Sequence, residues 1–300
     1  MVDSSSPRSR PVPPPPGVIA EIIARALHED LASGDVTTEA IVPAELTALG
    51  VAMSKAALLS CGSQVAKSVF EAVDPTLGFE VLVPDGTWVP AGRPLWEVRG
   101  AARSILMAER TALNFVQRLS GIATLAHRFV REIPVGASTR VVDTRKTTPG
   151  LRALERYAVR CGGAHNHRDN LGSSVLIKDN HIVAAGGVAA SVLRARARAS
   201  HTSKIEIEVA NLAELEQALS IGVDVIMLDN FELEQIQKAV SIVAGRALVE
   251  VSGNVTLERI ADLARAGADV ISVGSLTHSA PAADISLHVK VPLPERPIAA

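Results

Sequence analysis

The sequence predicts an α/β protein in two parts: an N-terminal α+β sandwich-like domain and an incomplete, open parallel β/α barrel. Two observations lead to this fold class. Before residue 101, strand and turn signals are grouped between helical segments, as in α+β layers. After residue 135, six apolar runs alternate with helical segments. Such alternation implies right-handed crossovers and a parallel sheet, and six strands are about enough to curl into a barrel-like sheet.

The composition agrees with strands that are buried on both faces. Hydrophobic residues make up 47% of the 300 residues and aromatic residues only 3%, so Ala, Val, Leu and Ile carry the apolar content. Runs of this kind suit parallel strands that are covered by helices. The net charge is −2, and no basic block is interleaved with aromatic residues. This balance argues against a general role in nucleic-acid binding.

The location of the protein is predicted to be cytoplasmic. No uninterrupted apolar stretch reaches the roughly 18 residues of a membrane-spanning helix. Residues 1–17 are rich in Pro, Ser and Arg and lack the apolar core of a signal peptide. We expect a disordered tail there, with a ligand for a proline-recognition domain as the alternative. Cys61 and Cys161 have no disulfide or metal-ligand spacing, which favours reduced structural thiols.

The N-terminal domain is expected to span residues 18–115. Apolar residues at helical spacing predict helices over 18–31 and 64–73. Between them we expect a loop at 34–43, in which Asp35 caps a helix or contacts a ligand. Short strands are expected over 47–60. Further strand and turn signals lie at 79–83, 84–86, 88–89 and 94–98. The C-terminal residues 286–300 are expected to pack back on this domain.

The second domain, residues 116–285, is expected to form the β/α barrel, with strands and helices in regular alternation. A helical pattern over 102–133 leads into it, with a break expected at Ser120-Gly121. On this pattern Arg110 and Arg118 fall on the solvated face. The expected strands are 140–143, 175–177, 205–209, 224–228, 247–251 and 269–273. The expected helices between them are 149–161, 183–199, 211–221, 232–243 and 255–266.

Polar residues follow the apolar runs at the points where the strands should end. They lie at 143–146, 178, 208, 229, 252–253 and 274–275. In parallel β/α barrels this rim is where the active site is built. A helix cap would explain any single position. Lys178 and Glu208, however, are poor caps and are costly to bury without a partner, so the set favours a binding rim.

The rim carries charges of both signs. Its crowded cations indicate a polyanionic ligand. Its charged residues are Arg145, Lys146, Arg168, Lys178, Glu208 and Asp229. Crowded cations repel one another unless a bound anion offsets them, and Arg suits bidentate binding of carboxylate or phosphate. Two carboxylates on neighbouring strands can hold Mg²⁺ or accept hydrogen bonds from ribose hydroxyls.

Two glycine-containing turns suggest a phosphate site. Ser252-Gly253-Asn254 precedes an expected helix, and the segment 273–278 follows the last strand. Both can present backbone N–H groups to an anion, and the loops after the last two strands are frequent phosphate sites in barrels. A plain turn is the alternative at each position.

Other kinds of active site have little support. His167 and His181 could act as bases near neutral pH, but neither lies in a zinc-binding pattern. The sequence has no hydrolase nucleophile elbow, Walker loop or dinucleotide-binding fingerprint. These absences argue against a triad hydrolase, a nucleoside triphosphatase and a dinucleotide-dependent enzyme.

The motifs as a set resemble those of the quinolinate phosphoribosyltransferase family. They are AERTALNFVQRLSGIAT (108–124), DTRKTTPGLRALERYAVRCGG (143–163), NHR (166–168), LIKDNH (176–181), EIEV (206–209), MLDNF (227–231) and VGSLTHS (273–279). The resemblance runs from about Leu27 to Asp284. It implies the activity of a carboxylating nicotinate-nucleotide diphosphorylase, a pentosyltransferase of de novo NAD synthesis. Such an enzyme converts quinolinate and phosphoribosyl pyrophosphate into nicotinate mononucleotide, pyrophosphate and CO2.

The resemblance also implies roles for individual residues. Four match residues that hold the quinolinate carboxylates: Arg145, His167, Arg168 and Lys178. Lys146 matches a catalytic lysine at the phosphoribosyl donor, and Glu208 and Asp229 match the catalytic pair at the ribose hydroxyls and Mg²⁺. Three match the sugar-phosphate end: Ser252, Gly253 and Gly274. Arg110 matches an arginine that reaches the substrate from a partner subunit, which implies a homodimer and leaves a hexamer open.

The sequence departs from the family pattern at two places and leaves two rival functions open. Ala210 stands near a position where an acidic residue is expected, and Val251 where a small polar residue is common. Both affect only the sugar-phosphate contacts.

One rival is a phosphoribosyltransferase-like paralogue with another acceptor, such as the homologue associated with molybdate transport, and the cationic acceptor cluster argues against it. The other is a non-catalytic anion sensor, against which the retention of Glu208 and Asp229 argues.

Overall fold

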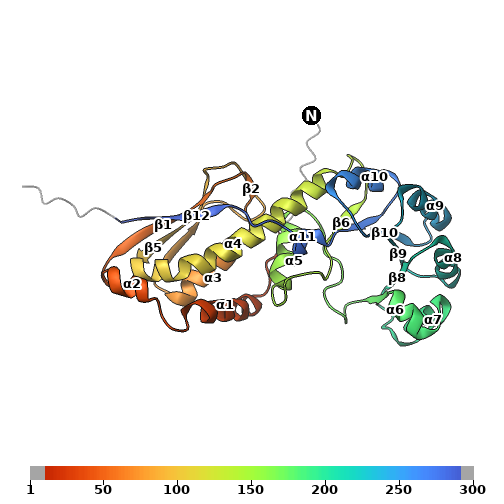
Figure 1. Cartoon of the computed structure of the whole chain (residues 1–300), viewed down its shortest axis with the longest axis horizontal. Helices are drawn as coiled ribbons and strands as arrows, with labels where there is room; N and C mark the ends of the chain where they lie inside the picture. The colour runs from red at the N-terminus through yellow and green to blue at the C-terminus, as the bar shows by residue number, and fades with distance from the viewer. Residues whose placement is uncertain (1–10, 292–300) are drawn as a thin grey trace, which may run out of the picture. The chain divides into compact units, whose positions relative to one another are not determined.

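The grouped and the alternating parts of the sequence form two different main sheets in the computed structural model, which describes residues 11–291 (Figure 1). One sheet is antiparallel and the other parallel, as the fold class predicts. The chain divides into two units. Of the described residues, the first unit comprises 11–125, 148–162 and 280–291, and the second comprises 126–147 and 163–279. The sequence instead assigned 116–125 and 148–162 to the barrel.

The first unit is built on a four-stranded antiparallel sheet in the order β12–β1–β5–β3. Its strands are β1 (Thr47–Ser54), β3 (Gly78–Val81), β5 (Pro94–Ala101) and β12 (Ile285–Lys290). A small second sheet pairs β2 (Leu58–Leu59) with β4 (Trp88–Val89). Strand β12 forms an edge beside β1. The last part of the expected C-terminal segment, residues 292–300, lies outside the described residues.

The N-terminal helices begin earlier and are more numerous than the sequence predicts. Helix α1 (Pro16–Leu31) starts two residues before the expected position, because Pro is well suited to the first turn of a helix. Pro14 is buried just before it, so the expected disordered tail does not extend to residue 17. Residues 1–10 of that tail lie outside the described residues. The expected loop contains α2 (Val36–Ile41), whose N-terminus Asp35 caps by accepting a hydrogen bond from Thr38 N.

Helix α4 (Ala102–Arg131) is continuous, so the break expected at Ser120-Gly121 is wrong. Contacts with distant segments explain why. A Cβ atom on Gly121 would lie 2.0 Å from the carbonyl oxygen of Pro281, so this glycine allows a close approach of two backbones rather than a turn. Ser120 Oγ exchanges hydrogen bonds of 3.0 Å with the backbone N–H and C=O of Cys61. Both residues are thus fixed by contacts with distant segments, and the helix continues through them.

Helix α5 (Arg152–Cys161) belongs to the first unit because its apolar side is buried there. The hydroxyl of Tyr157 donates a hydrogen bond of 2.8 Å to Asp85. The same carboxylate accepts bonds from the backbone N–H and the hydroxyl of Ser63. The free thiols of Cys61 and Cys161 are buried beside it, and burial raises the pKa of Cys61. Since donors already occupy Asp85, the cluster is well explained as structural.

Arg118 is not on a solvated face, contrary to the expectation. Its guanidinium donates to Glu155 Oε1 over 2.8 and 3.1 Å, and the Glu155 side chain is fully buried. The other oxygen, Oε2, accepts a hydrogen bond of 3.1 Å from the backbone N–H of Thr148. The pair therefore joins α4 to α5 and holds the residue that ends the DTRKTT segment.

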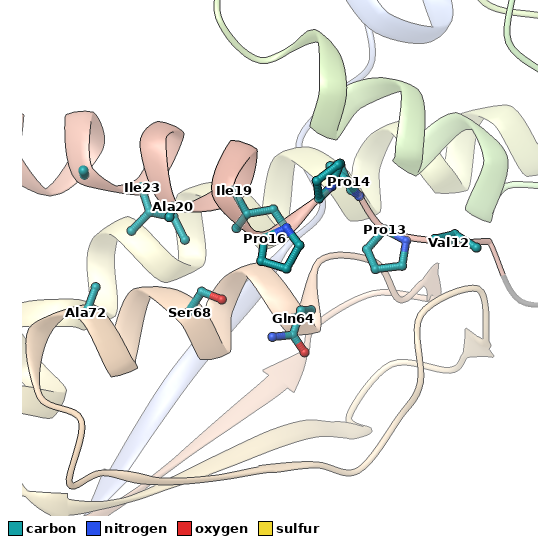
Figure 2. Close-up of a pocket in the computed structure, with 12 residues that line it drawn as sticks. Val12, Pro13, Pro14, Pro16, Ile19, Ala20, Ile23, Gln64, Ser68 and Ala72 are labelled. Atoms are coloured by element: carbon teal, nitrogen blue, oxygen red, sulfur yellow. The ribbon is translucent and has the colours of Figure 1, made fainter.

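A prominent cavity of the first unit lies where the proline-rich segment meets α1 and α3 (Ser63–Val73) (Figure 2). Its volume is about 530 Å³. Pro13 and Pro14 lead into α1, which lines one side with Ile19 and Ile23, and α3 lines the opposite side. The lining is mostly apolar. This segment is anchored by Arg160, whose guanidinium donates to the carbonyl oxygen of Val12 over 3.0 Å.

The second unit contains a six-stranded parallel sheet in the order β6–β11–β10–β9–β8–β7. The strands are β6 (Arg140–Val142), β7 (Val175–Ile177), β8 (Ile205–Val209), β9 (Val225–Asp229), β10 (Leu248–Ser252) and β11 (Val270–Ser272). Strands β6 and β7 are consecutive in the sequence but lie at opposite edges of this sheet. The barrel is therefore open, which confirms the predicted fold class.

Helical segments follow the strands of the second unit in the sequence, and several of them pack against those strands. They are α6 (Asp179–Ala185), α7 (Val188–Arg198), α8 (Leu212–Ile221), α9 (Leu233–Val243), the 3₁₀ helix η1 (Leu257–Arg259), α10 (Ile260–Arg265) and α11 (Ser275–His278). The single helix expected over 183–199 is two helices, because Gly186 is left-handed at φ +86° and ends α6. Across residues 11–291, no helix combines the length and apolar character needed to cross a membrane.

Replacing Glu155 by Gln should lower the free energy of unfolding by about 2–3 kcal/mol, because the partly buried guanidinium of Arg118 then lacks the charge of its partner. Thermal or urea unfolding measures the change. Glu97→Gln is the matched control, since its partner Arg99 is 64% exposed, and exposed pairs contribute only about 0–1 kcal/mol. Equal losses in the two variants would contradict the structural role of the Arg118–Glu155 pair.

Candidate active site

The register of the parallel strands places acidic side chains in a row on one face of the sheet. Glu208 on β8, Met227 on β9 and Glu250 on β10 are direct neighbours across the strands. Glu206 lies two residues before Glu208 and shares its face, because side chains alternate along a strand. Glu206 and Glu250 are only 6% and 3% exposed. This face therefore carries buried carboxylates beneath the predicted rim.

All predicted site residues except Arg110 lie in the second unit, at or just beyond the C-terminal ends of its strands or in the segment before β7. These are Arg145, Lys146, His167, Arg168, Lys178, Glu208, Asp229, Ser252, Gly253 and Gly274. The sheet thus brings together residues that are more than 120 positions apart in the sequence. The spatial grouping agrees with the predicted rim, while the role of each residue stays a prediction.

Lys178 and Glu208 form an ion pair across the ends of β7 and β8. The register pairs Ile177 with Ile207, so the next residues of the two strands meet. The Glu208 side chain is 13% exposed and that of Lys178 is 47% exposed. This pairing explains how a lysine and a glutamate that are poor helix caps are accommodated at strand ends. The backbone N–H of Lys178 also donates to His181 Nδ1 over 2.9 Å, which gives His181 a local role at the start of α6.

Lys146 lies over the end of β11, where Gly274 leaves room for it. A Cβ atom on Gly274 would be 3.1 Å from Cδ of Lys146. The backbone carbonyl oxygen of Lys146 accepts a hydrogen bond of 2.9 Å from Thr277 Oγ1, and Thr277 is fully buried. The lysine is therefore held through its backbone while its side chain stays exposed.

The ends of β9 and β10 fit together through a second glycine. Gly253 is left-handed at φ +92°, and a Cβ atom there would lie 2.2 Å from Asn230 Oδ1 and 2.9 Å from Asn230 N. The backbone N–H of Asn230 donates to the Ser252 carbonyl oxygen over 3.0 Å. The Asn230 side chain also donates to Asp229 Oδ2 over 2.9 Å. Gly253 is therefore required for the position of Asp229 and its neighbour.

The helices beside these glycines are shorter than the phosphate prediction assumed. The turn at 252–254 leads to η1, a 3₁₀ helix of three residues, before α10 begins. Gly274 precedes α11, which has four residues. The assignment of a sugar-phosphate site to Ser252, Gly253 and Gly274 rests on the turns themselves and stays a prediction.

Asp143 organises the segment that carries His167. Its side chain is completely buried. Oδ1 accepts a hydrogen bond of 2.8 Å from His167 N, and Oδ2 accepts one of 2.6 Å from Asn166 Nδ2. The segment also runs beside β6 through a parallel bridge between Val142 and His165. The conformation of the NHR motif is therefore set by the aspartate at the end of β6.

His167 lies between the two buried glutamates. Its Nε2 atom is 3.3 Å from Glu206 Oε2 and 3.4 Å from Glu250 Oε1. Burial lowers the pKa of His167, but the hydrogen bond with Glu206 and the charges of both carboxylates outweigh burial and raise the pKa to about 10. Burial raises the pKa of Glu206, and the charge of Glu250 adds to that effect.

Arg168 follows directly and brings a second cation close to Arg145. Burial lowers the pKa of the Arg168 guanidinium, and the nearby charge of Arg145 lowers it further. Arg168 Nη1 donates to the carbonyl oxygen of Ser174 over 3.2 Å. The rim thus holds crowded positive charge at Arg145 and Arg168, as the sequence predicts.

Arg110 lies in the first unit, exposed on α4. Together with Glu29, Asp30 and Asn114 it lines a cavity of about 210 Å³. Its side chain projects from the same unit as the Arg118–Glu155 pair.

The buried glutamates at 206 and 250 were not identified from the sequence. Each stands inside an apolar strand, in the runs IEIEV and LVEVS. A charged residue in a strand that is otherwise buried is itself a signal of a site, because burial without a partner is costly. Asp143 was recognised only as a residue at a strand end.

The second unit is an open parallel β/α barrel whose C-terminal rim, the place of the active site in barrel enzymes, carries both cations and carboxylates. Comparisons with known families narrow this description. Residues 35–120 match the N-terminal domain and residues 122–288 the C-terminal domain of quinolinate phosphoribosyl transferase. The chain belongs to the quinolinate phosphoribosyltransferase family.

Individual relatives agree with this assignment. The nicotinate-nucleotide pyrophosphorylase [carboxylating] of Mycobacterium leprae is 44% identical over 273 residues, which cover 89% of this chain and 95% of the relative. A probable enzyme of the same name from Methanocaldococcus jannaschii is 42% identical, with 90% and 96% covered. The solved structure of the nicotinate-nucleotide pyrophosphorylase from Francisella tularensis superposes with a TM-score of 0.87 at 40% identity, covering 92% of this chain and 97% of that one.

Replacing Gly253 by Ala should lower the thermal unfolding midpoint, because the new methyl group overlaps Asn230 in addition to straining the backbone. Overpacking of this kind costs about 1–3 kcal/mol beyond the backbone strain. Gly245→Ala is the matched control, since Gly245 has φ +75° and no atom within 4 Å of a Cβ. Equal unfolding midpoints for the two variants would show that the close approach to Asn230 is not required.

Proposed function

We propose that the protein transfers the phosphoribosyl group of phosphoribosyl pyrophosphate to quinolinate and releases CO2, giving nicotinate mononucleotide and pyrophosphate. The observation that carries this proposal is the grouping of the family's acceptor and donor residues at one rim of the second unit. The DTRK cations follow β6 at one edge of the sheet and Lys178 follows β7 at the other, while Glu208 and Asp229 stand on the neighbouring strands β8 and β9.

The acceptor is a dianion, and the cationic side of the rim suits it. Arg145 and Arg168 can each grip a carboxylate through two N–H groups. Lys178 contributes a mobile point charge, which its exposed position beside Glu208 allows. Clamping both carboxylates orients the pyridine ring, so the nitrogen is aligned before reaction.

The donor side provides charge stabilisation for the leaving group. Lys146 is exposed over Gly274 and is proposed to help pyrophosphate depart with the electron pair of the C1–O bond. The ribose then has oxocarbenium character, and the pyridine nitrogen forms the new bond to C1. The resulting pyridinium accepts the electron pair of the adjacent C–CO2 bond, so CO2 leaves and a proton replaces it. No covalent enzyme intermediate is needed.

Glu208 and Asp229 are proposed to hold Mg²⁺. They fit this ion, because hard carboxylate oxygens suit it and the two residues end neighbouring parallel strands on the same face. Bound Mg²⁺ would neutralise charge on the pyrophosphate group. Lys178 already pairs with Oε2 of Glu208, so the lysine and the metal would share this carboxylate.

Incubation with quinolinate, phosphoribosyl pyrophosphate and Mg²⁺ should yield nicotinate mononucleotide and one equivalent of CO2, detected by chromatography and by release of labelled carbon. Glu208→Ala should reduce turnover strongly, whereas replacement of the exposed Glu216 on α8 should not. Absence of product across a range of pH and salt would refute the proposed reaction.

We further propose a homodimer in which Arg110 acts across the interface, and a cytoplasmic location, which the free thiols of Cys61 and Cys161 support. Arg110→Ala and Lys146→Ala should each abolish turnover while the subunits still associate. Mixing the two variants should restore part of the activity, because a hybrid dimer would contain one site with both side chains. Size-exclusion chromatography with light scattering gives the assembly state. Mixed dimers that form without any activity would contradict the cross-subunit role.

A further inference from the structure

A buried acidic pair stands behind a site that is expected to bind a dianion, which is unexpected on charge alone. Glu206 and Glu250 are almost completely buried on β8 and β10. Their carboxylates point toward the same atom, His167 Nε2, over 3.3 and 3.4 Å. The pair would repel an acceptor carboxylate unless cations separate the two. The ring of His167 contacts both glutamates, so a positive charge on this ring would provide the separation.

The glutamates in turn depend on the imidazole ring. Two carboxylates buried this deeply repel each other, and each needs a hydrogen-bond donor or a cation. Glu250 Oε1 has no hydrogen-bond partner of good geometry among residues 11–291, so its proximity to the ring is its main compensation. Between the two strands β9 contributes Met227, which carries no charge.

Other charged groups near the ring favour a protonated imidazole over a metal ion as the cation. His167, Glu206 and Glu250 offer ligand atoms within 4.8 Å of one another. However, Arg168 is adjacent to His167 in the chain, and Arg145 is close enough to lower the pKa of Arg168. A divalent cation would add to this repulsion, whereas one proton on the ring adds less charge. The carboxylate of Asp143, which contacts the backbone of His167, already accepts hydrogen bonds from His167 N and Asn166 Nδ2.

The ring has one orientation that serves both neighbours. Nε2 faces the carboxylates, and Nδ1 accepts a hydrogen bond of 2.7 Å from the backbone N–H of Arg168. A neutral ring therefore carries its proton on Nε2. A second proton on Nδ1 requires the Arg168 amide to give way, so the charge of the ring is linked to the conformation of the segment that holds the arginine.

We propose that Glu206 and Glu250 are positioning residues that hold His167 with Nε2 toward the sheet and keep its ring cationic when the dicarboxylate acceptor binds. In the empty site their negative charge offsets the crowded cations Arg145 and Arg168, while Nδ1 of His167 accepts from the Arg168 N–H. The glutamates touch neither substrate nor reacting atoms. The inference rests on the proposed function for the identity of the acceptor.

The decisive variant is Glu250→Gln, which keeps the shape of the side chain and removes its charge. In the full-length protein, ¹⁵N-histidine NMR should show His167 titrating at lower pH than in the parent. Above the pH at which His167 of the variant loses its proton, the KM for quinolinate should rise relative to the parent by up to about tenfold per pH unit, since one pKa unit is tenfold in proton affinity. The kcat and the KM for phosphoribosyl pyrophosphate should change little. Glu216→Gln, on the surface of α8, is the control that should match the parent.

Two further measurements keep the test decisive. Glu250→Asp retains the charge and should return the His167 titration toward that of the parent, which also serves if Glu250→Gln does not fold. Calorimetric titration with Zn²⁺ and Mn²⁺ tests the metal alternative. An unchanged titration of His167, a KM increase that is the same at every pH, or a bound metal lost on Glu250→Gln would each overturn the proposal.

The NMR titration separates this inference from the proposed function. If His167 shifts as expected but the parent makes no nicotinate mononucleotide, the positioning role stands and the proposed reaction fails. If the parent is active and His167 titrates identically in Glu250→Gln, only the positioning role fails.

Discussion

Compensation of crowded charge is the constraint on which the second unit depends. Its rim holds several cations in a small space, which would be unstable without anions nearby. The structure supplies these anions from within the sheet: Glu208 pairs with Lys178, while Glu206 and Glu250 face His167. The rim is thereby stable while empty. A bound polyanion would then interact with cations whose positions are already set, which reduces the cost of ordering them on binding.

Parallel register is the device that makes this compensation possible. Neighbouring parallel strands place residues side by side. Glu208, Met227 and Glu250 therefore form one row, although they lie on three different strands. The loops add a second level of control. Gly253 and Gly274 permit side chains of neighbouring loops to approach closely, and a larger residue at either position would displace a group that the reaction is proposed to use. Sheet geometry and loop geometry therefore act on the same rim.

The first unit contributes support of a different kind. Arg118 and the buried Glu155 connect α4 with α5 and hold the backbone of Thr148. Sequence reasoning placed Arg118 on a solvated face, because the amphipathic pattern of a single helix contains no information about a carboxylate 37 positions away. The same limitation explains the break expected at Ser120-Gly121. Gly121 favours a turn locally, but the backbone of Pro281 occupies the space of its missing side chain.

Hydrophobic periodicity and the polar residues after each apolar run determined the fold class, the strands of the open barrel and most of the rim, because these features depend on local alternation and on the direction of parallel strands. The family motifs added the roles proposed for the rim residues. Only the tertiary structure decided which charges meet. The contacts of His167 with Glu206 and Glu250, and of Arg118 with Glu155, join residues from different strands or helices. Sequence spacing does not encode such distances, since they arise from the register and packing of elements that are far apart in the chain.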